Sequence, residues 1–264
     1  MSRSVIYTSI SGDYDTLYEP TGEFRDIDFV CFTDNPNVSS KRWEIRSLPK
    51  TIKNPILASR HPKILPHMYF PDHETSIYID GNFEPQRSID ELLEKYLADK
   101  PILLFRHPRR DCAYKEIEEC LRVAKGNPDI LIAQRESYLG AGFPFSFGLY
   151  EAGVMVRKHH ASKVAEAMEA WWQQFEKFCG RDQVSLPYAL WQTGLVPTVV
   201  STTVRDTFFF SRQHRKEGSR ALRQDMHNRL IAYAPYRWVY SLFRKIKTLK
   251  RVSRIRKHEE GKTI

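Results

Sequence analysis

Short apolar runs alternate with helix-like segments from the start of this chain to about residue 211. Strand-like runs occur at residues 5–8, 28–34, 43–46, 76–79, 102–105, 153–156, 196–203 and 207–210. Helical spacing or helix-capping residues mark residues 56–68, 88–97, 114–124, 162–178 and 182–191. Alternation of this kind predicts an α/β fold in which helices flank a mixed, mainly parallel sheet.

The charge of the chain divides it into two parts. Residues 1–211 contain 25 Lys+Arg and 28 Asp+Glu, whereas residues 212–264 contain 16 Lys+Arg and 4 Asp+Glu. The net charge of +9 therefore comes entirely from the end of the chain. We expect one domain over residues 1–211 and a basic helical C-terminal extension over residues 212–264.

The basic extension has the pattern of an amphipathic helix. Apolar residues from Trp238 to Ile255 recur at steps of three and four, and lysines and arginines fall between them. Such a helix suits an anionic membrane surface. Packing against the main domain or a second subunit is the plainer alternative, and nucleic-acid binding is another, although no module that reads bases is recognisable.

Several sequence features bear on where the protein acts. No run of 18 or more apolar residues is present, and the first residues lack the long apolar stretch of a secretory signal. The four cysteines show no metal-ligand spacing: Cys31, Cys112, Cys120 and Cys179. We expect a cytoplasmic protein whose cysteines are reduced. The basic extension could hold this protein at the inner face of the membrane.

The clearest candidate site follows the strand-like run at residues 76–79. There the chain reads Asp80-Gly81-Asn82. Ligands of open α/β sheets bind beyond the carboxyl ends of strands, and a carboxylate there suits Mg²⁺ or Mn²⁺. Gly81 allows a close backbone approach, and Asn82 offers a neutral oxygen. The alternative interpretation is an ordinary turn, because all three residue types favour turns.

Seven segments carry a pattern that extends over most of the chain. In order they are SGDYD (11–15), VCFTD (30–34), SRHPKILPHMYFP (59–71), SIYIDGN (76–82), RHPRRDCAYKEIEEC (106–120), EAGVMVRKH (151–159) and RDQVSLPYALW (181–191). Together they resemble one known family, the TOD/MUCI-type glycosyltransferase-like domain family. That family is similar to nucleotide-sugar glycosyltransferases of the Rossmann-like GT-A fold, including the retaining family-eight group. The resemblance covers roughly residues 5–211 and implies a GT-A domain.

The resemblance implies a divalent metal, Mn²⁺ or Mg²⁺, that bridges the diphosphate of a sugar nucleotide. Asp80, Gly81 and Asn82 stand at the Asp-x-Asp position of these enzymes, with Asn82 in place of the second acid. That replacement removes one charge from the metal site and puts strict metal dependence in doubt. His214 would complete the metal site, as a late histidine often does in similar enzymes.

The resemblance also implies contacts to the nucleotide. Thr8 and Tyr14 would contact the base or ribose, and Asp34 would accept a hydrogen bond from a base N–H. Arg60 and Lys63 precede the metal strand, where either could pair with phosphate. The alternatives are a strand-end turn for Asp34 and a solvated helix face for the two cations.

Three later segments are implied to surround the sugar and its phosphates. Arg109 belongs to an anion cradle, and His107 would donate to a phosphate or hydroxyl, although a lone histidine is more often structural. Glu151 and Gly153 belong to a segment that resembles a stretch lining the donor sugar, with glutamate at position 151 in place of asparagine. Asp182 and Gln183 open a helix beside it, where Asp182 could equally be an N-cap. The implied catalytic residues are Asp182, Gln183 and Glu151.

The expected function is transfer of a sugar from a nucleotide-sugar donor, UDP-linked, to a glycan or lipid-linked acceptor in cell-surface polysaccharide or lipopolysaccharide synthesis. Both retaining and inverting outcomes stay open at this point. The alternatives are a non-catalytic nucleotide-sugar-binding relative and a nucleic-acid-binding protein that acts through its basic extension.

Overall fold

A computed structural model describes residues 3–86, 93, 100–123, 125–178 and 181–201, together with the backbone of residues 209–211. The chain divides into two compact units, Met1–Arg215 and Lys216–Ile264. The second unit, which carries the predicted amphipathic helix, lies outside the described residues, as does the helix predicted over residues 88–97 apart from Leu93. The architecture below is therefore that of the first unit.

A seven-stranded sheet forms the centre of this unit, in the order β3-β2-β1-β4-β7-β6-β8. Its strands are β1 (Ser4–Ile10), β2 (Ile27–Thr33), β3 (Glu44–Ser47), β4 (Thr75–Ile79), β6 (Ile102–Arg106), β7 (Tyr150–Arg157) and β8 (Thr198–Val200). β7 runs antiparallel to its neighbours β4 and β6, and the other described pairings of this sheet are parallel. The predicted mixed, mainly parallel sheet is confirmed.

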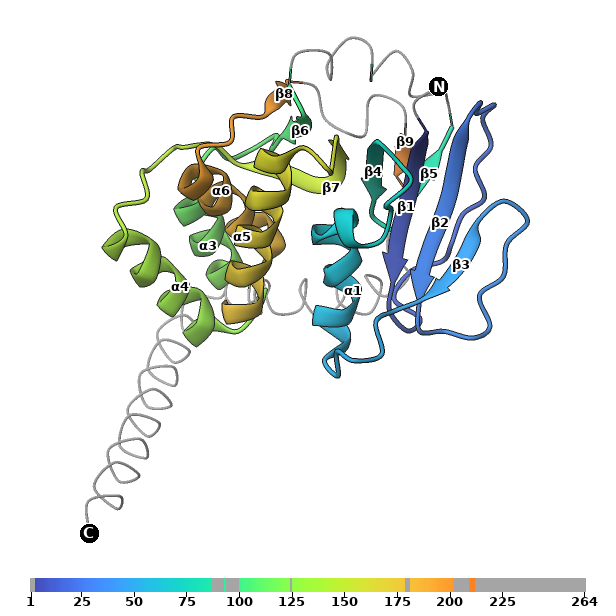
Figure 1. The fold of residues 1–264 in the computed structure, drawn as a ribbon. Helices are drawn as coiled ribbons and strands as arrows, with labels where there is room; N and C mark the ends of the chain where they lie inside the picture. The colour runs from blue at the N-terminus through green and yellow to red at the C-terminus, as the bar shows by residue number, and fades with distance from the viewer. Residues whose placement is uncertain are drawn as a thin grey trace. The chain divides into compact units, whose positions relative to one another are not determined.

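Apolar side chains are buried on both faces of the sheet. Successive residues of one strand contribute to opposite faces, because their side chains alternate in direction. Val5 and Tyr7 of β1 join one apolar cluster, which also contains residues of α1 (Pro55–Ile64), α5 (Ser162–Phe178) and α6 (Asp182–Thr193). Ile6 and Ile10 join the cluster on the other face. Figure 1 shows α1 and α5 covering the same face of the sheet. Layers of this kind are those expected from the alternating sequence.

Two further helices and a small second sheet complete the described unit. α3 (Ala113–Arg122) and α4 (Pro128–Gly140) form a third apolar cluster with α6. β5 (Phe83–Pro85) pairs with β9 (Phe209–Ser211) in antiparallel fashion. The Phe83 N–H at the start of β5 donates to the carbonyl of Asp80 at 2.9 Å, so the chain turns sharply after the central strand β4.

Some elements differ from the sequence predictions. The sequence patterns above indicate no helix over residues 128–140, yet Asn127 caps α4 with its side chain and Pro128 occupies the first turn. These are standard helix-start signals. The helix predicted over residues 56–68 ends at Ile64 and continues as a 3₁₀ turn, η1 (Pro66–Met68). Pro66 accounts for this break because it cannot donate a helical hydrogen bond.

Candidate active site

The site is built around the turn that follows β4. The Asp80 N–H donates to the carbonyl of Gly153 on β7 at 2.8 Å, which continues the strand pairing as far as the acid. A Cβ added at Gly81 would lie 2.8 Å from Cγ1 of Ile10 and 3.0 Å from Cβ of Asp15. Glycine is therefore required at position 81, because the turn packs directly against the end of β1 and the loop after it.

Lys63, from the last turn of α1, joins two carboxylates. Its ammonium nitrogen lies 2.7 Å from Oδ2 of Asp182 and 3.2 Å from Oδ1 of Asp80. The Lys63 side chain is only 1% exposed. The same nitrogen lies 4.6 Å from the centre of the Tyr78 ring, and the Tyr78 hydroxyl donates to Oδ1 of Asp80 at 2.9 Å. A buried lysine is thus compensated by two acids and an aromatic face.

Asp182 is the first residue of α6 and is held ionised. Burial alone would raise the pKa of Asp182, but the charges of Lys63, Arg60 and Arg181 outweigh burial and hold that pKa well below its usual range. Oδ1 of Asp182 accepts the backbone N–H of Gln183 at 2.9 Å. The Gln183 side-chain amide donates to the carbonyl of Tyr150 on β7 at 3.0 Å. The predicted Asp182–Gln183 pair is therefore fixed between a helix start and the central sheet.

Arg60 lies one turn before Lys63 on α1 and faces the same acids. Its Nε is 3.3 Å from Oδ2 of Asp182. Burial is the largest single influence and lowers the pKa of Arg60, but Asp182, Tyr78, Asp80 and Tyr14 together outweigh it and raise that pKa above its usual range. Spacing of three residues on a helix places both cations on one side. The structure thus brings Arg60 and Lys63 together with Asp80 and Asp182, and phosphate binding by the two cations stays a prediction.

A second charged cluster adjoins the first through α6. Glu116 on α3 is buried and accepts Nε of Arg110 at 2.6 Å, while Arg181 lies 3.9 Å from its other oxygen. Arg181 immediately precedes Asp182 and also donates to Oε1 of Gln183 at 3.5 Å. Two arginines therefore converge on one buried carboxylate beside the Asp182 helix.

His107 lies at the end of β6 next to this second cluster. Its Nδ1 accepts the backbone N–H groups of Arg109 and Arg110 at 3.2 and 3.0 Å. Burial lowers the pKa of His107, and the charge of Arg110 lowers it further. A neutral ring that accepts through Nδ1 carries its proton on Nε2, and this nitrogen lies 3.5 Å from Nη2 of Arg110. Donation from His107 to a phosphate or hydroxyl stays a prediction. The Arg109 side chain is exposed.

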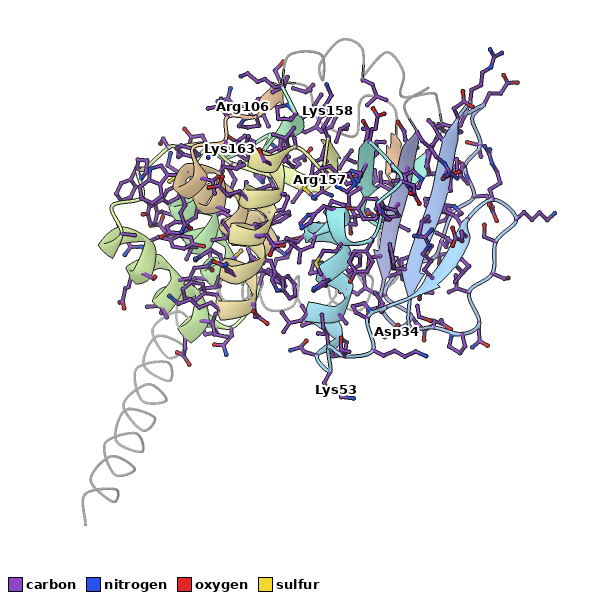
Figure 2. All side chains as sticks on the ribbon, viewed as in Figure 1. Asp34, Lys53, Arg106, Arg157, Lys158 and Lys163 are labelled. Carbon is purple, nitrogen blue, oxygen red and sulfur yellow. The ribbon has the colours of Figure 1, made fainter. Side chains whose placement is uncertain are left out.

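The predicted nucleotide-binding residues occupy the ends of β1 and β2. Asp34, which Figure 2 labels, accepts a hydrogen bond from the Ser11 hydroxyl at 3.1 Å. It also accepts the backbone N–H of Gly12 at 2.5 Å, so it joins the two strand-end loops. Tyr14 lies in the same loop and is half-buried. Thr8 lies inside β1 and is 1% exposed. Glu151 stands on β7 opposite Phe105, and Gly153 adjoins Asp80.

The residues after β4 suit a hard divalent cation. Lys63 and Tyr78 both bond to Oδ1 of Asp80. A Cβ at Gly153 would lie 3.2 Å from Oδ2, so glycine keeps this second oxygen uncovered. In the described part of the chain no group of three or more His, Cys, Asp or Glu side chains converges. Asp80 and Asn82 are the residues that could hold such an ion, and phosphates and water would then have to supply most of its ligands. His214 lies outside the described residues.

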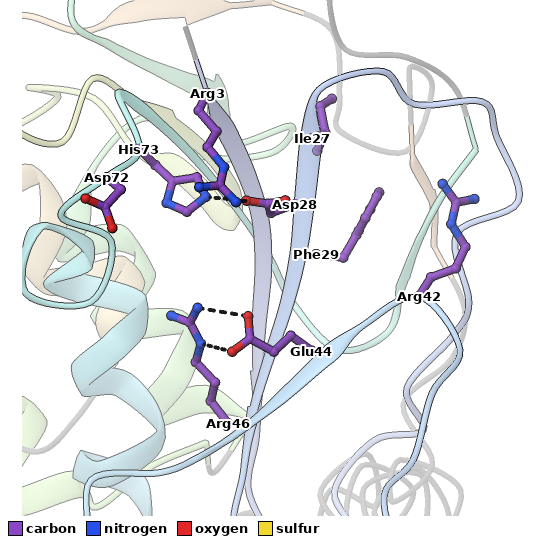
Figure 3. Close-up of a pocket in the computed structure, with 9 residues that line it drawn as sticks. All are labelled: Arg3, Ile27, Asp28, Phe29, Arg42, Glu44, Arg46, Asp72 and His73. Atoms are coloured by element: carbon purple, nitrogen blue, oxygen red, sulfur yellow. Dashed lines mark hydrogen bonds and ion pairs between the residues drawn. The ribbon is translucent and has the colours of Figure 1, made fainter.

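A separate pocket of about 410 Å³ lies at the opposite, amino-terminal ends of β1, β2 and β4 (Figure 3). Its charged groups engage one another: Asp28 bonds to Arg3 and His73 at 2.8 Å each, and Glu44 bonds to Arg46 at 2.8 Å. None of the predicted site residues lines it. We therefore place the candidate active site at the turn after β4.

Three residues of the site were not singled out by the sequence patterns: Tyr78, Glu116 and Arg181. Tyr78 precedes Asp80 by two residues, which puts both side chains on the same face of the strand. This two-residue spacing is a feature of the sequence that could have identified Tyr78 as part of the site. Glu116 and Arg181 are brought together by the packing of α3 against α6, and no local pattern in the sequence signals that contact.

Comparison with known proteins decides the family. A sequence model described as "TOD1/MUCI70, glycosyltransferase-like domain" matches residues 42–217. The chain belongs to the TOD1/MUCI70 glycosyltransferase-like family. The resemblance identified from its motifs is thus confirmed. The matched range contains the residues whose side chains contact the Lys63 ammonium, namely Tyr78, Asp80 and Asp182, whereas Thr8, Tyr14 and Asp34 lie before it.

Individual relatives of this TOD1/MUCI70 domain are distant. A protein named "Probable hexosyltransferase MUCI70", from Arabidopsis thaliana, is 26% identical over 178 residues, which is 62% of this chain and 30% of that protein. The chain therefore spans less than a third of the length of that relative.

Solved structures that match this chain include the galactosyltransferase LgtC in complex with donor and acceptor sugar analogues. Its TM-score with this chain is 0.44 and its sequence identity is 11%, and the match covers 76% of this chain and 74% of LgtC. Mouse xyloside xylosyltransferase 1 gives a TM-score of 0.42 and 10% identity, covering 76% of this chain and 85% of that one.

Proposed function

We propose that this chain is a glycosyltransferase that moves a sugar from a nucleotide donor, UDP-linked, to a glycan or lipid-linked acceptor. The observation that carries the proposal is the convergence of Lys63 and Arg60 with Asp80 and Asp182 at the end of β4, within the range that matches the family. Membership of a glycosyltransferase-like family supports the reaction class. The site supports a donor with an anionic leaving group.

The two cations of α1 suit the charge that builds on a departing diphosphate. Lys63 and Arg60 are already fixed by Asp182, so they need little reorganisation when a donor binds. Asp80 and Asn82 would hold the divalent cation, which would neutralise part of the diphosphate charge when bound. Arg109 and His107 would extend the same anion-binding surface beyond β6.

Asp182 is suited to charge stabilisation and poorly suited to taking a proton. A general base works best with a pKa near the working pH, whereas three cations keep the pKa of Asp182 far below it. Its carboxylate would face the positive charge that develops on the sugar ring, and Gln183 would orient the sugar. Glu151 then remains the candidate that could accept a proton from the acceptor hydroxyl.

Donor binding provides the direct test. Full-length protein would be screened for thermal stabilisation by nucleotides and nucleotide sugars, with Mn²⁺ and without it. A ligand at one hundred times its Kd stabilises the folded state by about 2.7 kcal/mol, so a true donor should stand out from the panel. Stabilisation by no nucleotide sugar, in either condition, would contradict the proposal.

A non-catalytic nucleotide-sugar-binding protein is the second candidate, and Asn82 is the observation that favours it. An amide in place of a second acid leaves one fewer negative charge for the metal. Hydrolysis of UDP-sugars in the absence of acceptor separates the two functions. Turnover that Mn²⁺ stimulates would identify an enzyme, whereas tight donor binding with no turnover would identify the binding protein.

We also propose that the protein works at the cytoplasmic face of a membrane, where lipid-linked acceptors are made. Among the described residues, no helix combines the length and apolar character of a bilayer span. The support is the charge of residues 212–264, in which basic residues outnumber acids fourfold. Binding to vesicles with and without anionic lipid would test this, using full-length protein and a variant with Lys245, Lys247, Lys250 and Arg251 changed to Gln. Equal binding of both proteins would count against it.

A further inference from the structure

Arg157, the last residue of β7, is completely buried without a carboxylate partner. It is 0% exposed and makes no salt bridge with any acid of the described chain. Figure 2 labels it between α1 and α5. Its guanidinium donates to the carbonyl of Ile64 at 3.5 Å, contacts Sδ of Met168 at 3.3 Å and bonds to the hydroxyl of Tyr7. Buried charges are costly unless they are paired, so this arginine requires an explanation.

Tyr7 extends the contact from Arg157 to the residue at the centre of the site. The Tyr7 hydroxyl donates to the carbonyl of Lys63 at 3.1 Å. Lys63 and Ile64 are the last two residues of α1, and the final carbonyls of a helix have no partner within the helix. The sheet therefore supplies two donors, Tyr7 from β1 and Arg157 from β7, to the last carbonyls of this helix.

The carboxyl end of α1 provides partial negative charge next to Arg157, which has no carboxylate partner among the described residues. A helix carries partial negative charge at its carboxyl end, which favours a cation there. Burial lowers the pKa of Arg157, whereas the neighbouring Tyr7 acts in the opposite direction. Nothing in this arrangement requires an arginine for packing alone, because an apolar side chain of similar length would fill the same space without the cost of a buried charge.

We propose that Arg157 and Tyr7 are positioning residues that hold the last turn of α1 on the sheet and thereby fix the Lys63 ammonium between Asp80 and Asp182. This inference rests on the proposed function for its catalytic consequence. Its structural part concerns Lys63 directly and is tested without any substrate.

The structural part is tested through the chemical reactivity of Lys63. Full-length protein would be treated briefly with acetic anhydride, and acetylation of Lys63 would be measured by mass spectrometry relative to the exposed Lys163. We expect Tyr7→Phe and Arg157→Met to raise the Lys63 rate about tenfold, because the ammonium is held less firmly. Tyr138→Phe is the matched control, since Tyr138 is equally buried and its hydroxyl accepts a bond from Gln134 at 2.8 Å.

Thermal stability separates positioning from a merely structural role. Arg157→Met removes the cost of a buried unpaired charge but also leaves the Ile64 carbonyl and the Tyr7 hydroxyl without their donor, so the two effects on stability oppose each other. We therefore expect the melting temperature of Arg157→Met to change little while its donor turnover falls about 10-fold to 100-fold. If Arg157→Met fails to fold, Tyr7→Phe carries the same measurements, since it removes one hydroxyl and keeps the ring.

A double-mutant cycle completes the test. In a Lys63→Met background, Arg157→Met should cause no further loss of turnover, because its effect passes through Lys63. Unchanged Lys63 acetylation in both single variants, or a full additional loss in the double variant, would overturn the inference. A wild-type protein with no turnover at all would contradict the proposed function instead, and the acetylation result would still decide whether Arg157 and Tyr7 position Lys63.

Discussion

The ammonium nitrogen of Lys63 lies 2.7 Å from Oδ2 of Asp182, although 119 residues separate them in the chain. The contact joins the last turn of α1 to the first residue of α6. Because the same nitrogen also reaches Asp80 at 3.2 Å, one buried cation connects the candidate metal-binding turn to the candidate sugar-binding helix.

Lys63→Met should destabilise the fold and abolish most turnover. The substitution leaves Asp80 and Asp182 near each other without the buried cation between them. Removing one partner of a buried ion pair costs about 3–5 kcal/mol, and urea unfolding would measure this loss. Lys163→Met is the matched control, because the Lys163 side chain is 62% exposed and pairs with Glu166 on the surface of α5. Equal stabilities of the two variants would show that the Lys63 contacts are not maintained in solution.

Acid should destabilise the protein through Asp182. The folded-state pKa of Asp182 is depressed, so its stabilising contribution is complete above the unfolded-state pKa of about 3.9 and is lost progressively as pH falls below that value. Urea unfolding between pH 6 and pH 2 should therefore show a steeper loss for wild type than for Asp182→Asn, by up to about 1.4 kcal/mol per pH unit for one proton. Parallel pH profiles would contradict the assignment.

Gly153→Ala should weaken donor binding that depends on metal. The added methyl group would lie 3.2 Å from Oδ2 of Asp80 and 3.2 Å from Cε2 of Phe83, so the carboxylate must move. Disturbing the surroundings of a metal ligand typically costs 10-fold to 100-fold in metal affinity, here about 10-fold, measured from Mn²⁺ titrations in the presence of UDP. Gly140→Ala is the control, because a Cβ there meets nothing within 4 Å. Equal Mn²⁺ affinities in the two variants would remove the case for Asp80 as a ligand.

Removal of divalent metal should abolish turnover without unfolding the protein. The described site offers few protein ligands, so the ion is expected to bind mainly together with the donor diphosphate. Dialysis against EDTA should leave the melting temperature of the ligand-free protein unchanged and reduce UDP-sugar hydrolysis at least about tenfold, with recovery on addition of Mn²⁺ or Mg²⁺. Full activity in EDTA would instead assign charge neutralisation to Lys63 and Arg60.

Local sequence patterns predicted the parts of the site that lie within one element. The strand before Asp80, the glycine after it and the helix that begins at Asp182 all depend on neighbouring residues, and the structure has each of them at the predicted place. The mainly parallel sheet was also predictable. Strands that are apolar on both faces must be covered by helices on both sides, and sheets covered in this way are mainly parallel. The helix α4 was missed even though Asn127 and Pro128 are local start signals.

Contacts between distant elements were decided by the tertiary structure alone. The sequence by itself determined that acids, cations and glycines follow the strands of an α/β domain, because strand and helix propensities act over a few residues. It did not determine that Lys63 joins Asp80 to Asp182, that Arg181 meets Glu116, or that Arg157 and Tyr7 support the end of α1. Those contacts depend on strand order, on the antiparallel insertion of β7 and on helix packing, which only the mutual burial of distant residues fixes.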